Sequence, residues 1–294
     1  MVKVLVVNNT PETCGVHQYG ENTYNHLSKS TKLDMCCVEA DNWNDVRSAI
    51  SYTNPSVILY NWHSYTMPWA DDAAISEYPV LKHVAVVHEA GMQVSSRMIR
   101  VEQDSLPRAL FSFDDTYVET SIPVIGSFGF ASWHKGWHNL ILKIQDQFDE
   151  AIFKLHIPPS YYCDPNAEHS REIVAEVQKR ITKPRIVLDA SYDFLSVPDL
   201  LKWLNQNTLN AFHYEPLPYN PGNSSVLDLA ISAKRPIAIT KSPMFRHISG
   251  AVPSIFLEDV PMKEIIANGI APLRPFYEKW SEDNFIKHWE SILC

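Results

Sequence analysis

Short apolar runs alternate with longer amphipathic segments along the chain, and this alternation predicts the fold. The first run is Val2–Val7, and comparable β-branched or aliphatic runs recur as far as Leu209–Phe212. The segments between them carry apolar residues every three or four positions, as Ile173, Val174 and Val177 do, which is the spacing of an amphipathic helix. Strands that alternate with helices predict an α/β protein with parallel, doubly wound sheets.

The alternation becomes irregular between Gly91 and Thr120 and then starts again. We therefore expect two Rossmann-like domains of similar size, 1–120 and 121–274, whose ligand loops at the strand carboxyl ends face a cleft. The expected strands are 2–7, 33–38, 57–60, 81–87, 97–101, 109–113, 122–128, 151–157, 185–188, 209–212, 236–240 and 254–257. The expected helices are 16–28, 42–52, 67–75, 136–147, 168–181, 197–205, 224–233, 261–267 and 278–293.

Composition and charge narrow the functional class. Of the 294 residues, 45% are hydrophobic and 20% are charged, which is typical of a soluble globular protein. The net charge of -9 and the lack of a basic run argue against nucleic acid as a partner, and no apolar stretch approaches the roughly 20 residues of a membrane span. Five cysteines without a C-x-x-C pair argue against a disulfide framework or a zinc site, so we expect a cytoplasmic protein.

The stretch from His213 to Thr240 contains the strongest candidate site. A proline-rich loop leads into a helix that begins near Ser224, where unpaired N–H groups and the helix dipole suit a phosphate group. Asp228 lies one turn later on the same face and suits ribose hydroxyls. The alternative is an ordinary capped helix in which Asp228 only complements the dipole.

Three segments resemble the GT-B glycosyltransferases, in particular the large retaining group of family 4. They are 14–19 (CGVHQY), 126–141, which contains Gly126-Ser127-Phe128 and Trp133-His134-Lys135-Gly136-Trp137, and 223–238, which begins Asn223-Ser224-Ser225-Val226-Leu227-Asp228. His88-Glu89 falls where the family has a histidine after its fourth strand. The resemblance spans nearly the whole chain and implies that the final segment, 275–294, returns to the N-terminal domain.

The resemblance also implies a donor site in the C-terminal domain, built from side chains with complementary chemistry. Lys135 would neutralise the diphosphate, and Gly15 would let the backbone approach the diphosphate or the sugar. The other expected donor contacts are Asn223, Ser224 and Ser225 with phosphate oxygens, Asp228 with ribose, Tyr192 with the base and Glu215 with the sugar. Each of these residues also has a simple structural explanation. Lys135 could be a solvated lysine, Gly15 part of a tight turn, and Ser224 or Ser225 an N-cap. Tyr192 could be a core aromatic and Glu215 a solvent-facing carboxylate.

His88 is the expected catalytic residue, because it follows a strand of the N-terminal domain and titrates near neutrality. It would act as general base on the acceptor hydroxyl or bind the transferring sugar, unless it is an ordinary loop histidine. Glu89 is a second candidate base, and His63 is a weaker one.

Two positions depart from the family pattern. The first of the family's two glutamates falls on Asn220, and Phe130 replaces an arginine, so Lys135 alone remains for the diphosphate. We predict a metal-independent glycosyltransferase, without a cofactor, that moves a sugar from a nucleoside-diphosphate sugar to the hydroxyl of a sugar, glycan or small molecule. The alternatives are a non-catalytic GT-B protein that binds a nucleotide or sugar, and a sugar-nucleotide epimerase of the same fold.

Overall fold

The computed structural model describes residues 1–89, 91–114, 117–217 and 222–294. This part of the chain divides into two units. Unit 1 contains residues 1–109 and 279–294 together with Gly222 and Asn223. Unit 2 contains the described residues of 110–219 and 224–278.

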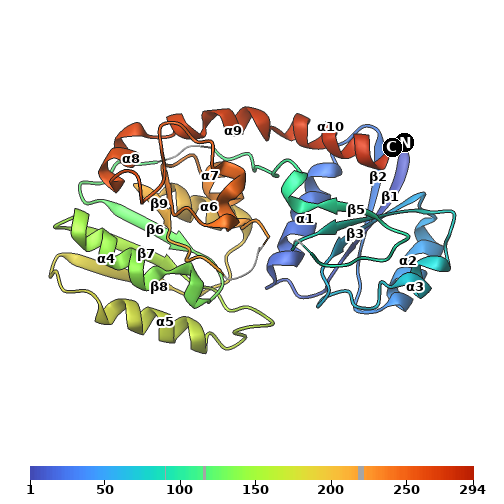
Figure 1. Ribbon diagram of the computed structural model, residues 1–294, viewed down its shortest axis with the longest axis horizontal. Helices are drawn as coiled ribbons and strands as arrows, with labels where there is room; N and C mark the ends of the chain where they lie inside the picture. Colours follow the sequence, from blue (N-terminus) through green and yellow to red (C-terminus); the bar gives the residue numbers. More distant parts are fainter. Residues whose placement is uncertain (90, 115–116, 218–221) are drawn as a thin grey trace. The chain divides into compact units, whose positions relative to one another are not determined.

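Unit 1 is built on five parallel strands in the order β2-β1-β3-β4-β5 (Figure 1). All of β3 is buried, as is β4 after its first residue, which is expected where helices cover both faces of a parallel sheet. The strands are β1 (Val2–Asn8), β2 (Leu33–Glu39), β3 (Val57–Trp62), β4 (Lys82–Val87) and β5 (Ile99–Glu102).

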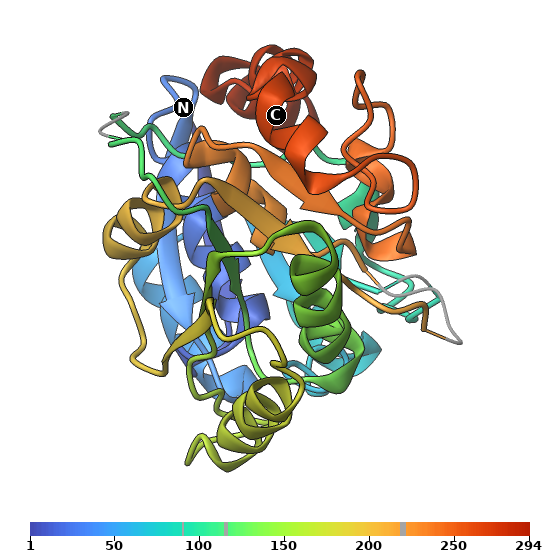
Figure 2. The same cartoon turned by 90° about the vertical axis from the view of Figure 1, so that its left-hand side faces the viewer.

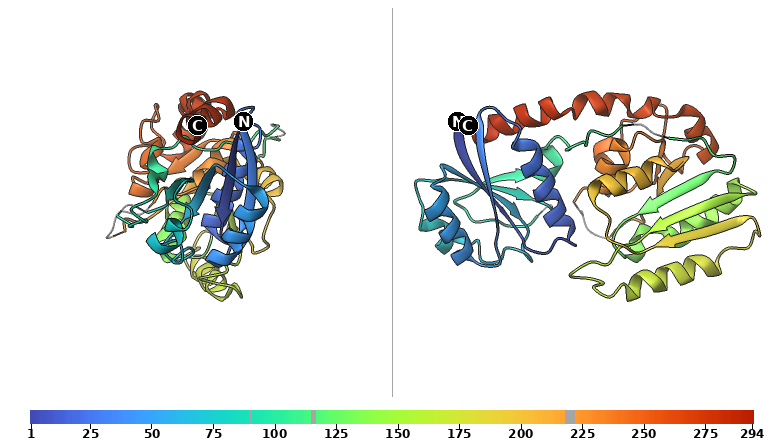
Figure 3. Two further views of the ribbon diagram at one scale, coloured as in Figure 1. Left: turned by 90° about the vertical axis from the view of Figure 1, so that its right-hand side faces the viewer. Right: turned by 180° about the vertical axis from the view of Figure 1, so that it is seen from behind.

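The two faces of this sheet carry different helices (Figure 3). Leu59 packs with residues of α1 and α10, whereas Ile58 packs with residues of α2 and α3. Successive strand residues point to opposite faces, so Asn61 points to the α1 face and Trp62 to the α2 face. The helices are α1 (Gly15–Leu27), α2 (Trp43–Thr53), α3 (Asp72–Ser76) and α10 (Glu282–Leu293).

The C-terminal helix α10 is bound to α1 and to the turn that follows it. Trp289 is buried in the same core cluster as Leu27. Around this core, Glu282 accepts a hydrogen bond from His26 Nδ1 at 2.9 Å, and Glu290 pairs with Lys32 at 2.7 Å. Segment 279–294 therefore folds as part of unit 1, although it follows unit 2 in sequence.

Unit 2 is built on a second sheet of five parallel strands, in the order β10-β9-β6-β7-β8 (Figures 1 and 2). Every residue of β6 and β9 is buried, which places these two strands at the centre of the sheet. The strands are β6 (Val124–Phe128), β7 (Ala151–His156), β8 (Ile186–Ser191), β9 (Leu209–Phe212) and β10 (Ile237–Ile239).

Helices also lie on both faces of this second sheet. The core cluster of one face includes Ile144 of α4, Ile173 of α5 and Ile265 of α8. The chain reverses its direction across the sheet after β8, so right-handed crossovers place α6 and α7 on the other face. The helices are α4 (Trp137–Gln147), α5 (Glu168–Lys179), α6 (Val197–Asn205), α7 (Val226–Ser232), α8 (Met262–Asn268) and α9 (Arg274–Lys279).

The strand orders locate the ligand-binding edge of each sheet. Counted within its own unit, unit 2 has the Rossmann order 3-2-1-4-5, whereas unit 1 has the flavodoxin-like order 2-1-3-4-5. In both orders ligands bind at the carboxyl ends of the two strands where the chain reverses direction. These switch points are β1/β3 in unit 1 and β6/β9 in unit 2.

The parallel α/β architecture is confirmed in both units, but four expected elements are wrong in whole or in part. The expected helix 67–75 forms only as α3, because Asp71 caps it and 67–71 is turn and loop. Segment 109–113 forms no strand, because the Phe111 N–H bonds the Ser232 hydroxyl at 2.9 Å instead of a strand neighbour. Segment 254–257 makes only an isolated bridge from Phe256 to β10. The expected helix 278–293 is two helices, because Ser281 caps α10 and begins it anew.

Candidate functional site

A tight turn follows β6 at the switch point of unit 2. Gly129, just after β6, has φ +139, and Gly136, after the 3₁₀ turn η2 (Trp133–Lys135), has φ +62. A Cβ atom on Gly136 would collide with the His213 carbonyl oxygen, and one on Gly129 would collide with Lys135 Nζ. These two glycines therefore let η2 pack against the end of β9 and place the Lys135 ammonium beside the carboxyl end of β6.

The ammonium of Lys135 is buried and has no counter-ion among the described residues. Its Nζ lies 5.7 Å from the centre of the Trp137 ring and 5.6 Å from that of Tyr214. No described residue forms an ion pair or hydrogen bond with it. Part of the residue remains exposed, but burial of the ammonium lowers the pKa of Lys135 to about 7. A bound anion would stabilise the charged form.

The N-terminus of α4 adds to the positive potential beside Lys135. Trp137 begins the helix and is fixed to β6, because its indole N–H donates to Ser127 Oγ at 2.9 Å. No side chain caps α4, and its first turn contains no acidic residue. The helix itself therefore supplies neither a cap nor a negative charge at this end, and the start of an uncapped helix is a place where phosphate binds.

Tyr214 connects Lys135 with the helix start predicted from the sequence. Its ring is buried, and its hydroxyl accepts a hydrogen bond from Ser224 Oγ at 3.3 Å. A Cβ atom on Gly129 would lie 3.6 Å from Val226 Cγ1, so the first residue of α7 lies beside the turn after β6. The structure thus brings Lys135, Ser224 and the start of α7 together at one switch point.

Glu215 is held by the first turn of α4. Its carboxylate accepts a hydrogen bond from Asn139 Nδ2 at 2.6 Å and lies 3.2 Å from His138 Nε2. Its backbone N–H donates to the His134 carbonyl at 2.6 Å. Burial, with the nearby Lys135 charge, lowers the pKa of His134 to about 4, so this imidazole is neutral near pH 7. Glu215 therefore lies at the edge of the Lys135 site.

The other expected donor residues have varied surroundings. Asp228 is buried on α7, and Ser225 directly precedes this helix. Asn223 is buried, and its amide has no hydrogen-bond partner in the described part of the chain. Tyr192 lies in the loop after β8, where its ring centre is 5.7 Å from the Arg171 guanidinium. Asn220 lies outside the described residues.

A directed chain of hydrogen bonds occupies the switch point of unit 1. Asn8 Nδ2 donates to the His17 carbonyl at 3.0 Å, so its Oδ1 is the atom that accepts from Asn61 Nδ2 at 2.7 Å. Asn61 Nδ2 also donates to the Val16 carbonyl. Asn61 Oδ1 therefore faces His88 Nε2, 2.6 Å away, and must accept its proton.

This chain fixes the tautomer of His88. Carbonyl oxygens only accept hydrogen bonds, so His88 carries its proton on Nε2 and leaves the Nδ1 lone pair as acceptor. Burial, with His63 and Arg108 nearby, lowers the pKa of His88 to about 3. The imidazole is therefore neutral near pH 7, and its Nδ1 can accept a hydrogen bond. The low pKa corrects the near-neutral titration expected from the sequence and makes His88 a weak base, because burial disfavours the charged form.

The neighbours of His88 include the other expected residues of unit 1. Glu89 is partly exposed, and its carboxylate lies 3.8 Å from His63 Nε2. Burial lowers the pKa of His63 despite this carboxylate. Gly15 is the first residue of α1, and open space surrounds its Cα where a Cβ atom would stand.

Residues that the sequence interpretation gave no role complete both sites. Asn8 is the last residue of β1 and Asn61 the last but one of β3, and together they orient His88. Tyr214 follows β9 and packs against Lys135. A polar or aromatic residue at the carboxyl end of a buried parallel strand is the signal that could have identified them.

Among the described residues, no helix is long and apolar enough to cross a membrane. No group of three histidine, cysteine, aspartate or glutamate side chains is arranged there to hold a metal ion.

Comparison with protein-family models finds no match, and comparison with curated proteins finds none either. Solved structures do match over the whole chain. HepE from Anabaena in complex with UDP is 10% identical, with a TM-score of 0.65 and 99% of each chain covered. An α,α-trehalose-phosphate synthase from Burkholderia xenovorans in complex with glucose-6-phosphate is 9% identical, with a TM-score of 0.64 and 99% of each covered.

An α-glucosyltransferase in complex with UDP is also similar, at 9% identity, a TM-score of 0.57 and 100% of each chain covered. Identities this low establish the fold alone. The chain has the two parallel α/β units of the GT-B fold, the fold of these glycosyltransferases. Membership of family 4 stays a prediction.

Proposed function

We propose that this chain is a metal-independent glycosyltransferase that moves a sugar from a nucleoside-diphosphate sugar to an acceptor hydroxyl. The donor diphosphate binds at the switch point of unit 2, next to Lys135 and the N-terminus of α4. Asn223, Ser224 and Ser225 contact its phosphate oxygens, and Asp228 the ribose. His88 of unit 1 acts on the acceptor hydroxyl or on the transferring sugar.

The observation that carries this proposal is the uncompensated charge of Lys135. A lysine at the switch point of a Rossmann-type sheet, next to an uncapped helix, lacks only the anion. The leaving nucleoside diphosphate gains negative charge as the glycosidic bond breaks, so Lys135 stabilises the transition state more than the ground state. The protein thereby supplies the charge that a divalent ion supplies in other transferases.

In unit 1, a neutral His88 with a free Nδ1 lone pair supports a role as hydrogen-bond acceptor more than a role as base, because its pKa of about 3 makes it a weak base. As a base, Nδ1 would take the proton of the acceptor hydroxyl while the oxygen attacks the anomeric carbon. As a sugar ligand, it would accept a hydrogen bond from a hydroxyl of the transferring sugar. His88→Ala should lower turnover more than donor affinity in either role.

Isothermal titration calorimetry with UDP, GDP and ADP tests the donor site. Lys135→Met and Asp228→Ala should each weaken nucleoside-diphosphate binding, by about tenfold to a hundredfold for the charged contact. Lys179→Met is the matched control, because this lysine is exposed on α5 and should leave the affinity unchanged. Unchanged affinity in both site variants would rule out the assignment.

Product analysis separates transfer from its alternatives. Incubation of the protein with the nucleotide sugar it binds should release the nucleoside diphosphate, quickly with an acceptor and slowly with water. An epimerised donor without released nucleotide would indicate an epimerase. Tight binding with neither product would indicate a non-catalytic binding protein.

A further inference from the structure

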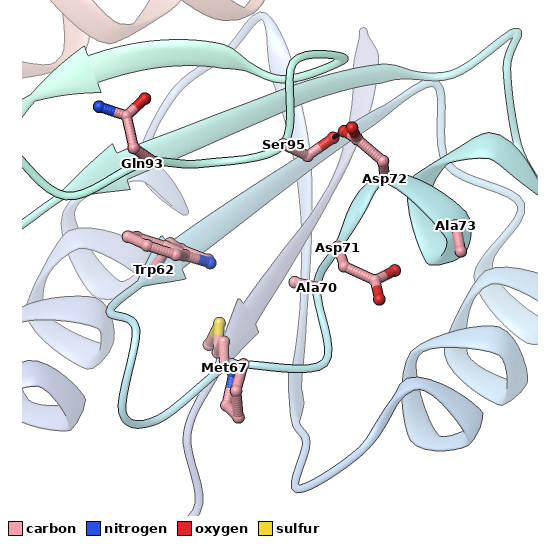
Figure 4. A pocket seen from close by; sticks show the side chains of 9 residues that line it. Trp62, Met67, Ala70, Asp71, Asp72, Ala73, Gln93 and Ser95 are labelled. Carbon is pink, nitrogen blue, oxygen red and sulfur yellow. Dashed lines mark hydrogen bonds between the residues drawn. The ribbon is translucent and has the colours of Figure 1, made fainter.

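The turn that follows β3 presents an exposed aromatic ring at the carboxyl edge of the sheet in unit 1. Residues 63–66 connect Trp62 to Met67, which are buried in the same core cluster and line one cavity (Figure 4). Between these two anchors Tyr65 is 84% exposed. The turn is therefore fixed at both ends, while the side chain of Tyr65 stays open to a ligand.

His63 determines the shape of this turn by accepting from three backbone N–H groups. Its carbonyl accepts from the Thr66 N–H at 3.1 Å and from the Met67 N–H at 2.9 Å. Its Nδ1 accepts from the Tyr65 N–H at 3.2 Å. Because a backbone N–H only donates, Nδ1 bears the lone pair, and the neutral imidazole carries its proton on Nε2.

The Tyr65 ring is held by His63 on one face only. The two ring centres are 5.5 Å apart and the ring planes differ by 30°, which is a stacked arrangement. The large exposure of Tyr65 leaves the other face of its ring open to solvent. An open aromatic face suits the C–H groups of a sugar ring, since contact with them removes apolar surface from water.

Next to this ring, a donor and an acceptor lie on either side of a short gap. His63 Nε2 is 3.8 Å from Glu89 Oε1, which is too far for a direct hydrogen bond. The Glu89 side chain is 41% exposed, so a ligand can reach it. A ligand hydroxyl at hydrogen-bond distance from both atoms would accept from Nε2–H and donate to the carboxylate, which satisfies both groups.

This pair lies beside the His88 site. Glu89 directly follows His88 in the chain, and Asn61, two positions before His63, accepts from His88 Nε2 at 2.6 Å. The Ser64 hydroxyl donates to Met92 Sδ at 3.6 Å, which joins the turn to the loop that follows Glu89. A sugar ring on Tyr65 would therefore lie at the same strand ends as the free lone pair of His88.

We propose that Tyr65 selects the acceptor: its open face stacks on a pyranose ring, and one hydroxyl of that ring bridges His63 and Glu89. The acceptor is then a sugar ring with an uncovered C–H face, and not a linear polyol or an amino-acid side chain. The inference rests on the proposed transferase function for the role of acceptor only. The binding of a sugar ring follows from the three side chains in unit 1.

Calorimetry and saturation-transfer NMR test this site with the methyl pyranosides of glucose, mannose and galactose, and with sorbitol as a polyol without a ring. At least one pyranoside should bind more tightly than sorbitol by about fivefold or more. Tyr65→Ala should weaken its binding by about fivefold to tenfold, whereas Tyr65→Phe keeps the ring and should stay within about twofold. Glu89→Ala should weaken it by about threefold to tenfold, because the bridging hydroxyl loses its acceptor.

Tyr52→Ala is the matched control. Tyr52 is 92% exposed, but it lies near the end of α2, which leads into the start of β3 and thus to the opposite edge of the sheet. This variant should bind the pyranoside as the wild type does, and unchanged Tm values would show that both alanine variants are folded.

Three results would overturn the proposal: no binding of any pyranoside, equal binding of sorbitol, or an equal effect of Tyr65→Ala and Tyr52→Ala. UDP binding without pyranoside binding would therefore contradict the Tyr65 site and leave the donor site intact. Pyranoside binding that depends on Tyr65, in a protein that does not bind UDP, GDP or ADP, would support the site and contradict the proposed transferase.

Discussion

Lys135 should make the protein less stable when no anion is bound, and its replacement by methionine should reveal this. Burial lowers the pKa of Lys135 from the ordinary lysine value of 10.5 to about 7. The unfolded chain therefore binds a proton that the folded protein holds only weakly, and folding is penalised below pH 10.5. The penalty is fully present below pH 7 and disappears as the pH rises from 7 to 10.5.

The shift gives a magnitude for this effect. With 1.36 kcal/mol per pKa unit, the penalty is about 4 kcal/mol at pH 7, about 2 kcal/mol at pH 9 and below about 0.5 kcal/mol at pH 10.5. Lys135→Met also removes two cation–π contacts with Trp137 and Tyr214, each of which contributes about 0.5–1 kcal/mol. We therefore expect the variant to be more stable than the wild type by about 2–3 kcal/mol at pH 7.

Urea denaturation at pH 7, 8, 9 and 10 measures the difference. The advantage of Lys135→Met should shrink steadily with rising pH, whereas the exposed control Lys179→Met should stay within about 0.5 kcal/mol of the wild type at every pH. At one UDP concentration, UDP should raise the stability of the wild type more than that of Lys135→Met, which binds it more weakly. A wild type as stable as Lys135→Met at pH 7, or a difference independent of pH, would refute this reasoning.

Three further outcomes are expected. Histidine ¹⁵N NMR should show His88 as the neutral Nε2–H tautomer from pH 5 to 8, and Asn61→Asp should raise its pKa; titration near pH 6.5 in the wild type would contradict the hydrogen-bond chain. His88 should lower the stability by up to about 1.4 kcal/mol per pH unit between pH 6.5 and 3, because the unfolded chain protonates it before the folded protein does. In urea denaturation, His88→Gln should therefore lose stability less steeply than the wild type by up to this amount, while other buried histidines such as His134 and His156 continue to contribute. Gly136→Ala should destabilise the folded protein by at least about 2 kcal/mol, because Gly136 has a positive φ and an added Cβ would clash with His213. Gly250→Ala is the control and should be nearly neutral, because its added Cβ meets no atom within 4 Å. Equal Tm values for the two variants would contradict the packing of Gly136.

The local periodicity of the sequence predicted most of the strands and helices. Strands such as 33–39 and 209–212 and helices such as 197–205 lie within one or two residues of their expected positions. Errors occurred where apolar residues serve contacts distant in sequence. Segment 109–113 looks like a strand, but its partner is Ser232, and no local pattern contains that information.

The candidate site was predictable only in part. The glycines and Lys135 carry a local signature, because a positive φ and a lysine beside a helix start are properties of a short segment. The absence of a counter-ion is not local, since it depends on every element packed against Lys135. Tyr214, which supplies one of the two rings over the ammonium, is 79 positions away in sequence.

The sequence by itself determined the alternation of strands and helices, the two α/β repeats and the glycine-containing turns after the strands. Each of these features depends only on residues that are close together in the chain. The tertiary structure alone decided the strand orders, and hence which strand ends form the switch points. It also decided the state of His88, whose tautomer is set by a backbone carbonyl through Asn61. Such properties follow from which groups are buried together and which remain without a partner, and only the assembled fold specifies that.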